Sequence, residues 1–148
     1  MQSIYPYLTF NGNCREAMQF YQQCLGGSLV LQTIGDMPHS EKMPRRMKNC
    51  ILHATLKNKN IVLAGSDIVP ETGINKGNAV SLVLTFRSKI DVEICYKKLS
   101  AGGVQTSPPA ITHYGALFGS LTDKFGNHWL LGCKILNNKK QALRGGCI

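Results

Sequence analysis

The chain has no hydrophobic segment long enough to span a membrane as a helix. Its apolar runs are short, as in Val80–Phe86. The first residues, MQSIYPYL, contain no basic stretch followed by a long apolar one, which a secretory signal would need. These two absences predict a cytoplasmic protein with no membrane partner.

The six cysteines form no C-x-x-C pair, which removes the main support for a zinc-ribbon or thioredoxin-type site. Cys14, Cys24 and Cys95 fall at apolar positions of two expected helices. A free thiol in such a place packs like a small hydrophobic side chain. We interpret these cysteines as structural, with a reactive or metal-bound thiol as the alternative.

Acidic residues are scarce: 8 of them face 17 basic residues, which gives a net charge of +9. Residues 134–148 contain four basic side chains and no acid, and residues 42–48 form a second basic cluster. Neither cluster has interleaved aromatic residues on which bases could stack. We therefore interpret residues 134–148 as a basic, flexible tail and expect no specific nucleic-acid partner. A nucleic-acid-binding accessory protein is the second alternative function.

Two segments of the chain repeat the same order of features. Asn13–Gly27 (NCREAMQFYQQCLGG) and Ser88–Gly103 (SKIDVEICYKKLSAGG) each begin at a capping residue and end at Gly-Gly. In the first segment Glu16 completes a capping box with Asn13. A two-strand unit then follows at Ala54–Gly65 and at Gly119–Gly132. This repeat predicts a duplicated structure with a ligand site between its copies.

Each half is predicted to contain a strand, a helix and three strands, which is an α+β fold of two βαβββ modules. The polar, proline-containing segment Asp36–Lys48 is predicted to be a loop, and Pro108-Pro109 to break a strand. We expect one domain over residues 1–133, with modules at about 4–66 and 78–133. The expected strands are Ile4–Phe10, Ser28–Ile34, Cys50–Leu56, Asn60–Gly65, Val80–Phe86, Gly103–Ser107, Ala116–Thr122 and His128–Gly132.

Alternation along the strands separates a helix-facing side from an open side. In Cys50–Leu56, for example, Ala54 and Leu56 would cover the helix while His53 and Thr55 face away. A face that mixes Tyr, Thr, His and Ser with Val and Leu suits a small-molecule pocket, and a partly solvated face without a ligand is the alternative. The predicted pocket-lining residues are Tyr5, Tyr7, Thr9, His53, Thr55, Ser81, Val83, His128 and Leu130.

His53 is the candidate catalytic residue, because imidazole exchanges a proton near neutral pH. No carboxylate stands near it in the sequence to orient its ring. Asp123 lies in the expected turn between the last two strands, where we expect it to cap that turn.

Three segments resemble one known group of proteins: YLTFNGNCREAMQFYQQCLGG at 7–27, GNAVSLVLTF at 77–86 and YGALFGSLTDKFGNHWLLG at 114–132. They are similar to the PhnB-like branch of the vicinal oxygen chelate superfamily, also labelled 3-demethylubiquinone-9 3-methyltransferase-like. The resemblance implies a glyoxalase / bleomycin resistance / dioxygenase fold with curved mixed sheets, helices on the outside, and a homodimer. A two-fold contact would also cover open sheet edges. No Gly-rich loop of the kind that binds S-adenosylmethionine is present, so we do not expect methyl transfer.

The metal enzymes of that superfamily hold a divalent ion with His and Glu from the two modules. The matching positions here are Tyr5 or Pro6, His53, Ser81 and Leu130, of which only His53 offers such a ligand. No cofactor is therefore predicted. The leading function is a small-molecule binding protein or an enzyme of unknown reaction. A metal-dependent lyase or dioxygenase is the first alternative.

Overall fold

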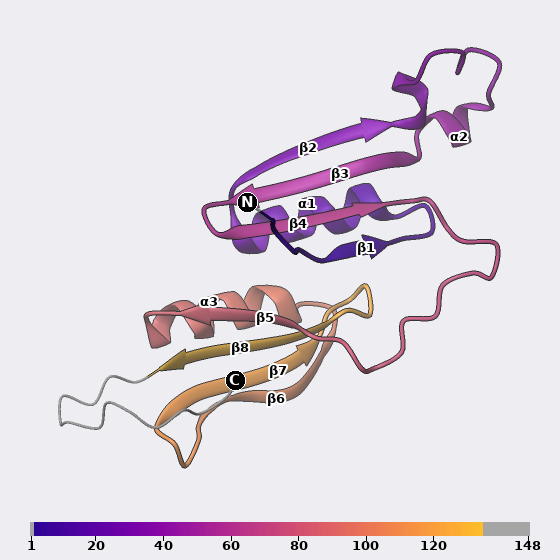
Figure 1. The fold of residues 1–148 in the computed structure, drawn as a ribbon. Coiled ribbons are helices and arrows are strands. Elements are labelled where there is room, and N and C mark those ends of the chain that lie inside the picture. Colours follow the sequence, from indigo (N-terminus) through magenta and orange to yellow (C-terminus); the bar gives the residue numbers. More distant parts are fainter. Residues whose placement is uncertain (1, 135–148) are drawn as a thin grey trace.

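The computed structural model describes residues 2–134, whose strands form two four-stranded mixed sheets (Figure 1). Each sheet contains one parallel pair, β1–β4 or β5–β8, and two antiparallel pairs. The equal strand order confirms the predicted duplication and the α+β fold class. In spatial order the strands are β1 (Tyr7–Thr9), β4 (Ile61–Ser66), β3 (Ile51–Asn58) and β2 (Ser28–Thr33), then β5 (Leu82–Phe86), β8 (His128–Lys134), β7 (Ala116–Thr122) and β6 (Val104–Ile111).

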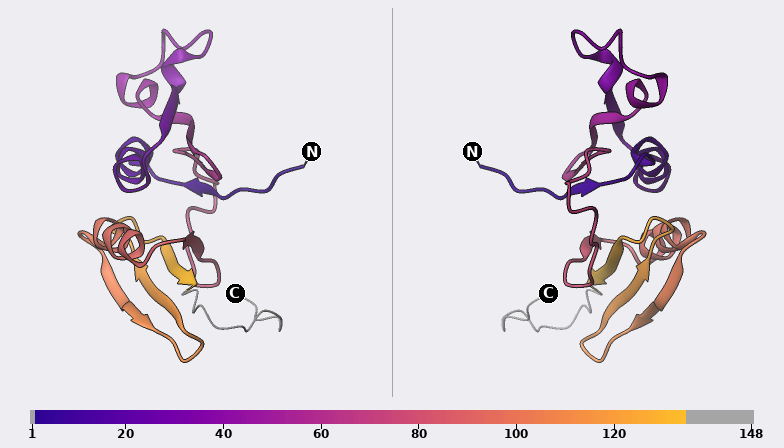
Figure 2. Two further views of the ribbon diagram at one scale, coloured as in Figure 1. Left: turned by 90° about the vertical axis from the view of Figure 1, so that its left-hand side faces the viewer. Right: turned by 90° about the vertical axis from the view of Figure 1, so that its right-hand side faces the viewer.

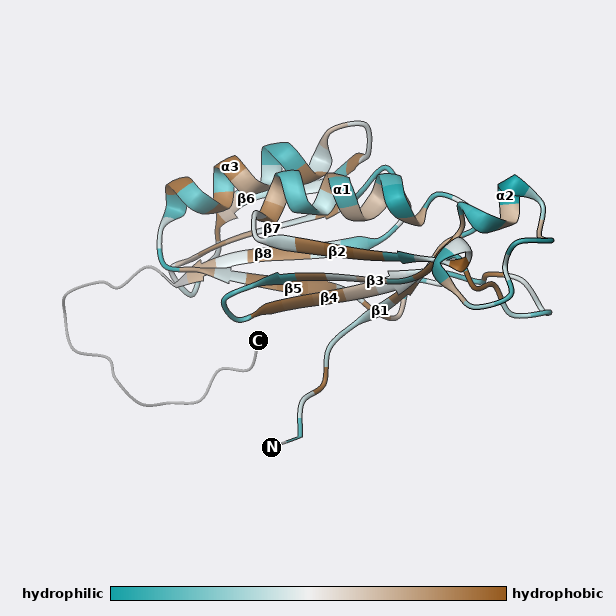
Figure 3. Ribbon diagram, turned by 90° about the horizontal axis from the view of Figure 1, so that it is seen from above, coloured by the Kyte–Doolittle hydropathy of each residue, from teal (hydrophilic) through white to brown (hydrophobic). Residues whose placement is uncertain are grey.

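Two long helices, α1 (Cys14–Leu25) and α3 (Lys89–Ser100), lie on the same side of the sheets (Figure 3). Their apolar faces join the buried strand residues in one core that runs through both halves of the chain. No helix among residues 2–134 is both long and apolar enough to cross a membrane. The predicted tail lies outside the described residues, except that Lys134 ends β8. The largest fully buried side chains include Tyr21, Met18, Ile51, Leu56, Leu99, Leu121 and Leu131.

The connection from β2 to β3 contains a 3-10 turn, η1 (Ile34–Asp36), and a short helix, α2 (Arg45–Lys48). The prediction of a loop throughout Asp36–Lys48 was therefore wrong. Pro44 occupies the N-cap of α2, and its carbonyl accepts the N–H groups of Met47 and Lys48. A proline just before a helix loses no hydrogen bond, so it marks a start as readily as a break.

The double proline does not break β6, which runs through Pro108 and Pro109 to Ile111. β6 is the outer strand of its sheet and pairs only with β7, so a proline can sit there without removing an inner hydrogen bond. The pairing register shifts on both sides of Ser107. A Cβ at Gly119 would lie 3.1 Å from Pro109, so the absence of a side chain there lets β7 approach the proline ring.

The predicted capping box at the start of α1 is also wrong, because Asn13 makes no side-chain cap hydrogen bond. Asp67, which follows β4, takes that place. Its Oδ1 accepts the N–H groups of Gly12 and Cys14, each at 2.9 Å, and its Oδ2 accepts the N–H of Ile51 at 2.8 Å. One carboxylate from the end of the first module thus joins α1, β3 and β4. Ser88 likewise makes no side-chain cap bond to α3.

Asp123 is 3% exposed and connects the two halves. Its Oδ1 accepts the N–H groups of Phe125 and Asn127, which confirms that it caps its turn. Its Oδ2 accepts two side-chain donors, the Tyr21 hydroxyl of α1 at 2.6 Å and the Trp129 indole N–H at 2.7 Å. The same turn therefore also holds α1 of the other module.

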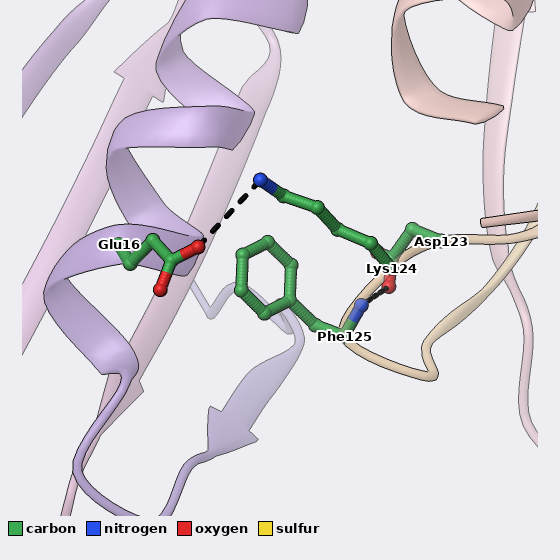
Figure 4. A network of polar contacts seen from close by, with 4 residues as sticks. All are labelled: Glu16, Asp123, Lys124 and Phe125. Carbon is green, nitrogen blue, oxygen red and sulfur yellow. Dashed lines mark hydrogen bonds and ion pairs between the residues drawn. The ribbon is translucent and has the colours of Figure 1, made fainter. Parts of the chain in front are cut away.

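The turn at 123–127 makes further contacts with α1 (Figure 4). Lys124 Nζ lies 3.6 Å from Glu16 Oε1 and 4.9 Å from the centre of the Phe20 ring. The Phe125 ring packs edge-on against Phe20 and Tyr21. Charged and aromatic contacts from both modules therefore meet at this one turn.

Both Gly-Gly pairs meet the same backbone constraint. The first glycines, Gly26 and Gly102, have φ values of 71° and 74°, as expected after a helix. The second glycines, Gly27 and Gly103, touch a neighbouring strand. A Cβ on either would lie 2.3 Å from a carbonyl oxygen, that of Lys57 or of Thr122. The duplication thus extends to backbone contacts that no side chain could replace.

The helix cysteines are packed in the core. Cys14 and Cys95 are 0% and 6% exposed, and burial raises the pKa of each thiol to about 12. Burial also raises the pKa of Cys24 to about 11. At neutral pH these groups are almost entirely thiols, which are poor nucleophiles and poor metal ligands. Their surroundings agree with the structural interpretation.

Candidate ligand cleft between the two sheets

A cleft of about 950 Å³ lies where the two sheets face each other. In Figure 1 the short edge strand β1, with β4 beside it, faces the edge strand β5. The walls come from residues 3–6, residues 60–63 and residues 80–84, together with the outward side chains of β3. Both modules therefore contribute to one cleft.

The cleft depends on the early departure of the N-terminal segment from the sheet. β1 pairs with β4 only from Tyr7 to Thr9, although a strand from Ile4 was predicted. Pro6 accepts the N–H of Ala64 through its carbonyl, but it has no N–H with which to extend the pairing. Figure 2 shows residues before β1 leaving on the side opposite α1. The edge of β4 at 61–63 is thereby left open to the cleft.

His53 projects from β3 into this cleft beside two hydroxyl groups. The Tyr7 hydroxyl lies 3.4 Å from its Nδ1, and Thr55 Oγ1 lies 3.0 Å from its Nε2. The Tyr7 ring stacks on the imidazole with 5.7 Å between ring centres. Hydroxyls both donate and accept, so either neutral tautomer of His53 can be satisfied. The arrangement can therefore take up or release a proton and pass it through a hydroxyl neighbour.

The predicted pocket residues occupy different parts of the molecule. Tyr5, His53, Thr55, Ser81 and Val83 border the cleft. Tyr7, Thr9 and His128 line an adjoining cavity of about 200 Å³ beside the linker, with Lys76 on its wall. Leu130 lies on β8 between Val83 and Ser120 and borders neither of these two spaces.

His128 is held by the linker between the two modules. Its Nε2 lies 3.2 Å from the Gly77 carbonyl, and its Nδ1 lies 2.9 Å from Thr122 Oγ1. A carbonyl can only accept, so Nε2 donates to the Gly77 carbonyl. The geometry gives His128 a role in holding the linker against β8.

Lys57 is a cleft residue that the sequence analysis missed. It stands on β3 two residues after Thr55 and therefore shares the open face with Thr55 and His53. The expected strand ended at Leu56, whereas β3 continues to Asn58. Had the alternation been continued by two residues, it would have identified this lysine. Asn60, in the same hairpin turn, was missed as well.

A sequence model of one protein family, described as 3-demethylubiquinone-9 3-methyltransferase, matches residues 2–131. The chain belongs to this PhnB-like family. Protein YjdN of Escherichia coli (strain K12) is 33% identical to it over 139 residues, which cover 85% of this chain and 91% of YjdN. This is the PhnB-like branch that the three segments resemble.

Solved structures confirm the glyoxalase-like fold. Protein PA1353 from Pseudomonas aeruginosa superposes on 90% of this PhnB-like chain and 98% of its own, with a TM-score of 0.79 and 37% identity. A Bacillus cereus PhnB protein, described as a putative 3-demethylubiquinone-9 3-methyltransferase, is 22% identical. Its superposition covers 89% of this chain and 99% of its own, with a TM-score of 0.67. A glyoxalase/bleomycin resistance protein/dioxygenase family enzyme from Burkholderia phytofirmans is 15% identical. Its superposition covers 88% of this chain and 97% of its own, with a TM-score of 0.63.

The superfamily's divalent metal does not fit the residues present. Of the positions that match its ligands, His53 lies in the cleft, Ser81 and Tyr5 offer only hydroxyls, and Leu130 offers no donor. Within residues 2–134, no group of three or more His, Cys, Asp or Glu side chains is placed to hold a metal ion. A divalent ion needs several such donors in a fixed geometry. The chemistry of the cleft is therefore derived from its own side chains.

Proposed function

We propose that this PhnB-like protein binds a small organic molecule in the cleft between its sheets. The observation that carries the proposal is the cleft of about 950 Å³, a size within the usual range for ligand sites. Leu82, Val83 and Val62 give it an apolar wall, while His53 and Thr55 supply polar groups. An apolar wall with a few convergent polar groups is the usual composition of such a site.

In this proposal His53 exchanges a proton with the bound molecule, and any reaction depends on that exchange. Its two hydroxyl neighbours, on Tyr7 and Thr55, hold the ring and can relay the proton. A metal-dependent lyase or dioxygenase would need ligands that Ser81 and Leu130 do not supply. The nucleic-acid alternative stays a prediction, because most of the basic tail lies outside residues 2–134.

The test of ligand binding uses N-phenyl-1-naphthylamine, a neutral dye that fluoresces in apolar sites. We expect one saturable site in the unmodified protein. Val83→Trp places a large side chain on the β5 wall of the cleft and should lower the affinity for the dye at least about tenfold. The reason is that binding depends on the apolar area that the dye buries in the cleft. The control is Val104→Trp on β6, where the native side chain is 64% exposed and does not border the cleft. Equal effects of the two variants would contradict the proposal.

We also propose that two copies of the chain associate. Tyr7 and Val30 lie in one cross-strand row with Ala64 and Thr55, on the face opposite the helices. Tyr7 is 50% exposed and Val30 is 65% exposed. An apolar sheet face of this kind is stabilised by a symmetric contact with a second copy. Light scattering at micromolar concentration should give twice the mass of one chain, and a monomer's mass would contradict the proposal.

A further inference from the structure

The described lining of the cleft carries positive charge and no negative charge. Lys57 is the one lysine or arginine among the described residues that line it, and none of those residues is aspartate or glutamate. The ion pair that residues 2–134 form joins Lys124 to Glu16, elsewhere in the molecule. Within the described part of the chain, Lys57 therefore forms no ion pair.

Lys57 stands at a defined place relative to the other polar groups. It follows His53 by four residues on the same face of β3, so the two positions are about 13 Å apart along the strand. Thr55 lies between them. Beyond Lys57 the chain turns into β4, and Asn60 from that turn also borders the cleft. The cleft thus has a cationic end at the hairpin turn and an imidazole end at His53.

The walls between these two ends are apolar. Ile61 and Val62 of β4 form one side, and Val80 and Leu82 at β5 form the other. The side chain of Lys57 is exposed, so its ammonium group can reach the charged group of a ligand whose apolar body packs on these walls. A charge-assisted hydrogen bond from an ammonium group is stronger than a neutral one.

We propose that the molecule bound in the cleft is an organic anion, with its charged group on Lys57 and its apolar body extending past Thr55 toward His53. This inference rests on the proposed small-molecule function and specifies its ligand class. Carboxylates, sulfonates and phosphate esters all present the required anionic oxygens. The contact with Lys57 fixes one end of the ligand. The part of the ligand that meets His53 must therefore span the distance between the two residues, about 13 Å along the strand.

The test compares two dyes that share one aromatic body and differ in charge. N-phenyl-1-naphthylamine is neutral, and 8-anilinonaphthalene-1-sulfonate carries a sulfonate. The unmodified protein should bind the sulfonate about tenfold more tightly, the size of effect typical of one charge-assisted contact. In Lys57→Gln the ratio of the two affinities should fall to near one. In the matched control Lys59→Gln, a lysine of the turn that follows β3 and does not line the cleft, the ratio should persist.

Competition then identifies the anion. Octanoate and octyl phosphate should each displace the sulfonate dye at a lower concentration than octanol does. The anion that displaces it at the lower concentration carries the preferred charged group. Raising the salt concentration to 1 M should reduce the advantage of both, because salt screens a partly exposed pair.

The outcomes separate this inference from the proposed function. If both dyes bind equally well and Val83→Trp weakens both, the cleft binds small molecules but the anion preference is overturned. The inference is also overturned if Lys59→Gln removes the preference as fully as Lys57→Gln, since the effect would then arise from general charge. If neither dye binds, or if Val83→Trp has no effect on either, the proposed function itself fails.

Discussion

Replacing Asp123 with alanine is expected to lower the free energy of unfolding by about 3–5 kcal/mol, because buried donors lose a charged partner. The carboxylate accepts hydrogen bonds from the Tyr21 hydroxyl, the Trp129 indole and two backbone N–H groups. Tyr21 and Trp129 are 0% and 2% exposed, so water cannot replace the lost acceptor without opening the core. Burial, and then the charge of Asp123, raise the pKa of Tyr21, so its hydroxyl stays protonated and needs an acceptor.

Urea unfolding followed by circular dichroism measures this loss. Asp123→Asn should recover only part of it, because an amide presents one acceptor oxygen where the carboxylate presents two. The control is Asp91→Ala, in the exposed first turn of α3, which should cost less than about 1 kcal/mol. A loss at Asp123 no larger than that at Asp91 would show that the network does not hold the modules together.

Replacing Gly27 with alanine is the second change with a large expected effect. The residue has a φ of 95°, which strains any L side chain, and its Cβ would lie 2.3 Å from the Lys57 carbonyl oxygen. That oxygen belongs to β3, next to the Ser28–Lys57 pair, so it can move only if the β2–β3 pairing moves. We expect a loss of about 3 kcal/mol or more, from strain and overpacking together.

Two matched substitutions separate the causes. Gly73→Ala has a similar φ of 78° but nothing within 4 Å of the new Cβ, so it measures strain alone, about 1 kcal/mol. Gly103→Ala has no positive φ but meets the Thr122 carbonyl oxygen at 2.3 Å, so it measures the contact alone. Thermal unfolding should rank Gly27 as the most damaging of the three. Equal melting temperatures for the Gly27 and Gly73 variants would contradict the contact argument.

Short-range patterns in the sequence predicted the repeated elements well. The helices α1 and α3 each begin one residue after the residue expected to cap them, and each ends within two residues of its Gly-Gly pair, because an apolar stripe and a Gly-Gly end are local signals. Alternation likewise identified the buried face of β3, since Ala54 and Leu56 are both 0% exposed. Where the local chemistry determines the structure, the sequence was sufficient.

The errors occurred where a distant segment decides the outcome. Asp67 caps α1 from 53 residues away, and no pattern around Asn13 reveals that competitor. The effect of the prolines on β6 was predicted wrongly because a strand tolerates proline when it is the outermost strand of its sheet. The position of a strand in the sheet is set by distant segments. Alternation assigned Tyr7, Thr9 and His128 to the correct face, but it does not say which end of a strand meets a cavity. Depth along the strand is set by how the two sheets meet.

The bond from Tyr21 to Asp123 spans 102 residues of chain, which matters during synthesis. At a ribosomal rate of about 5–20 residues per second, α1 emerges roughly 5–20 s before its acceptor. Through that interval the aromatic face of α1 around Phe20 and Tyr21 lacks the Phe125 turn that completes its packing. The nascent first half therefore exposes an aromatic surface until the turn arrives.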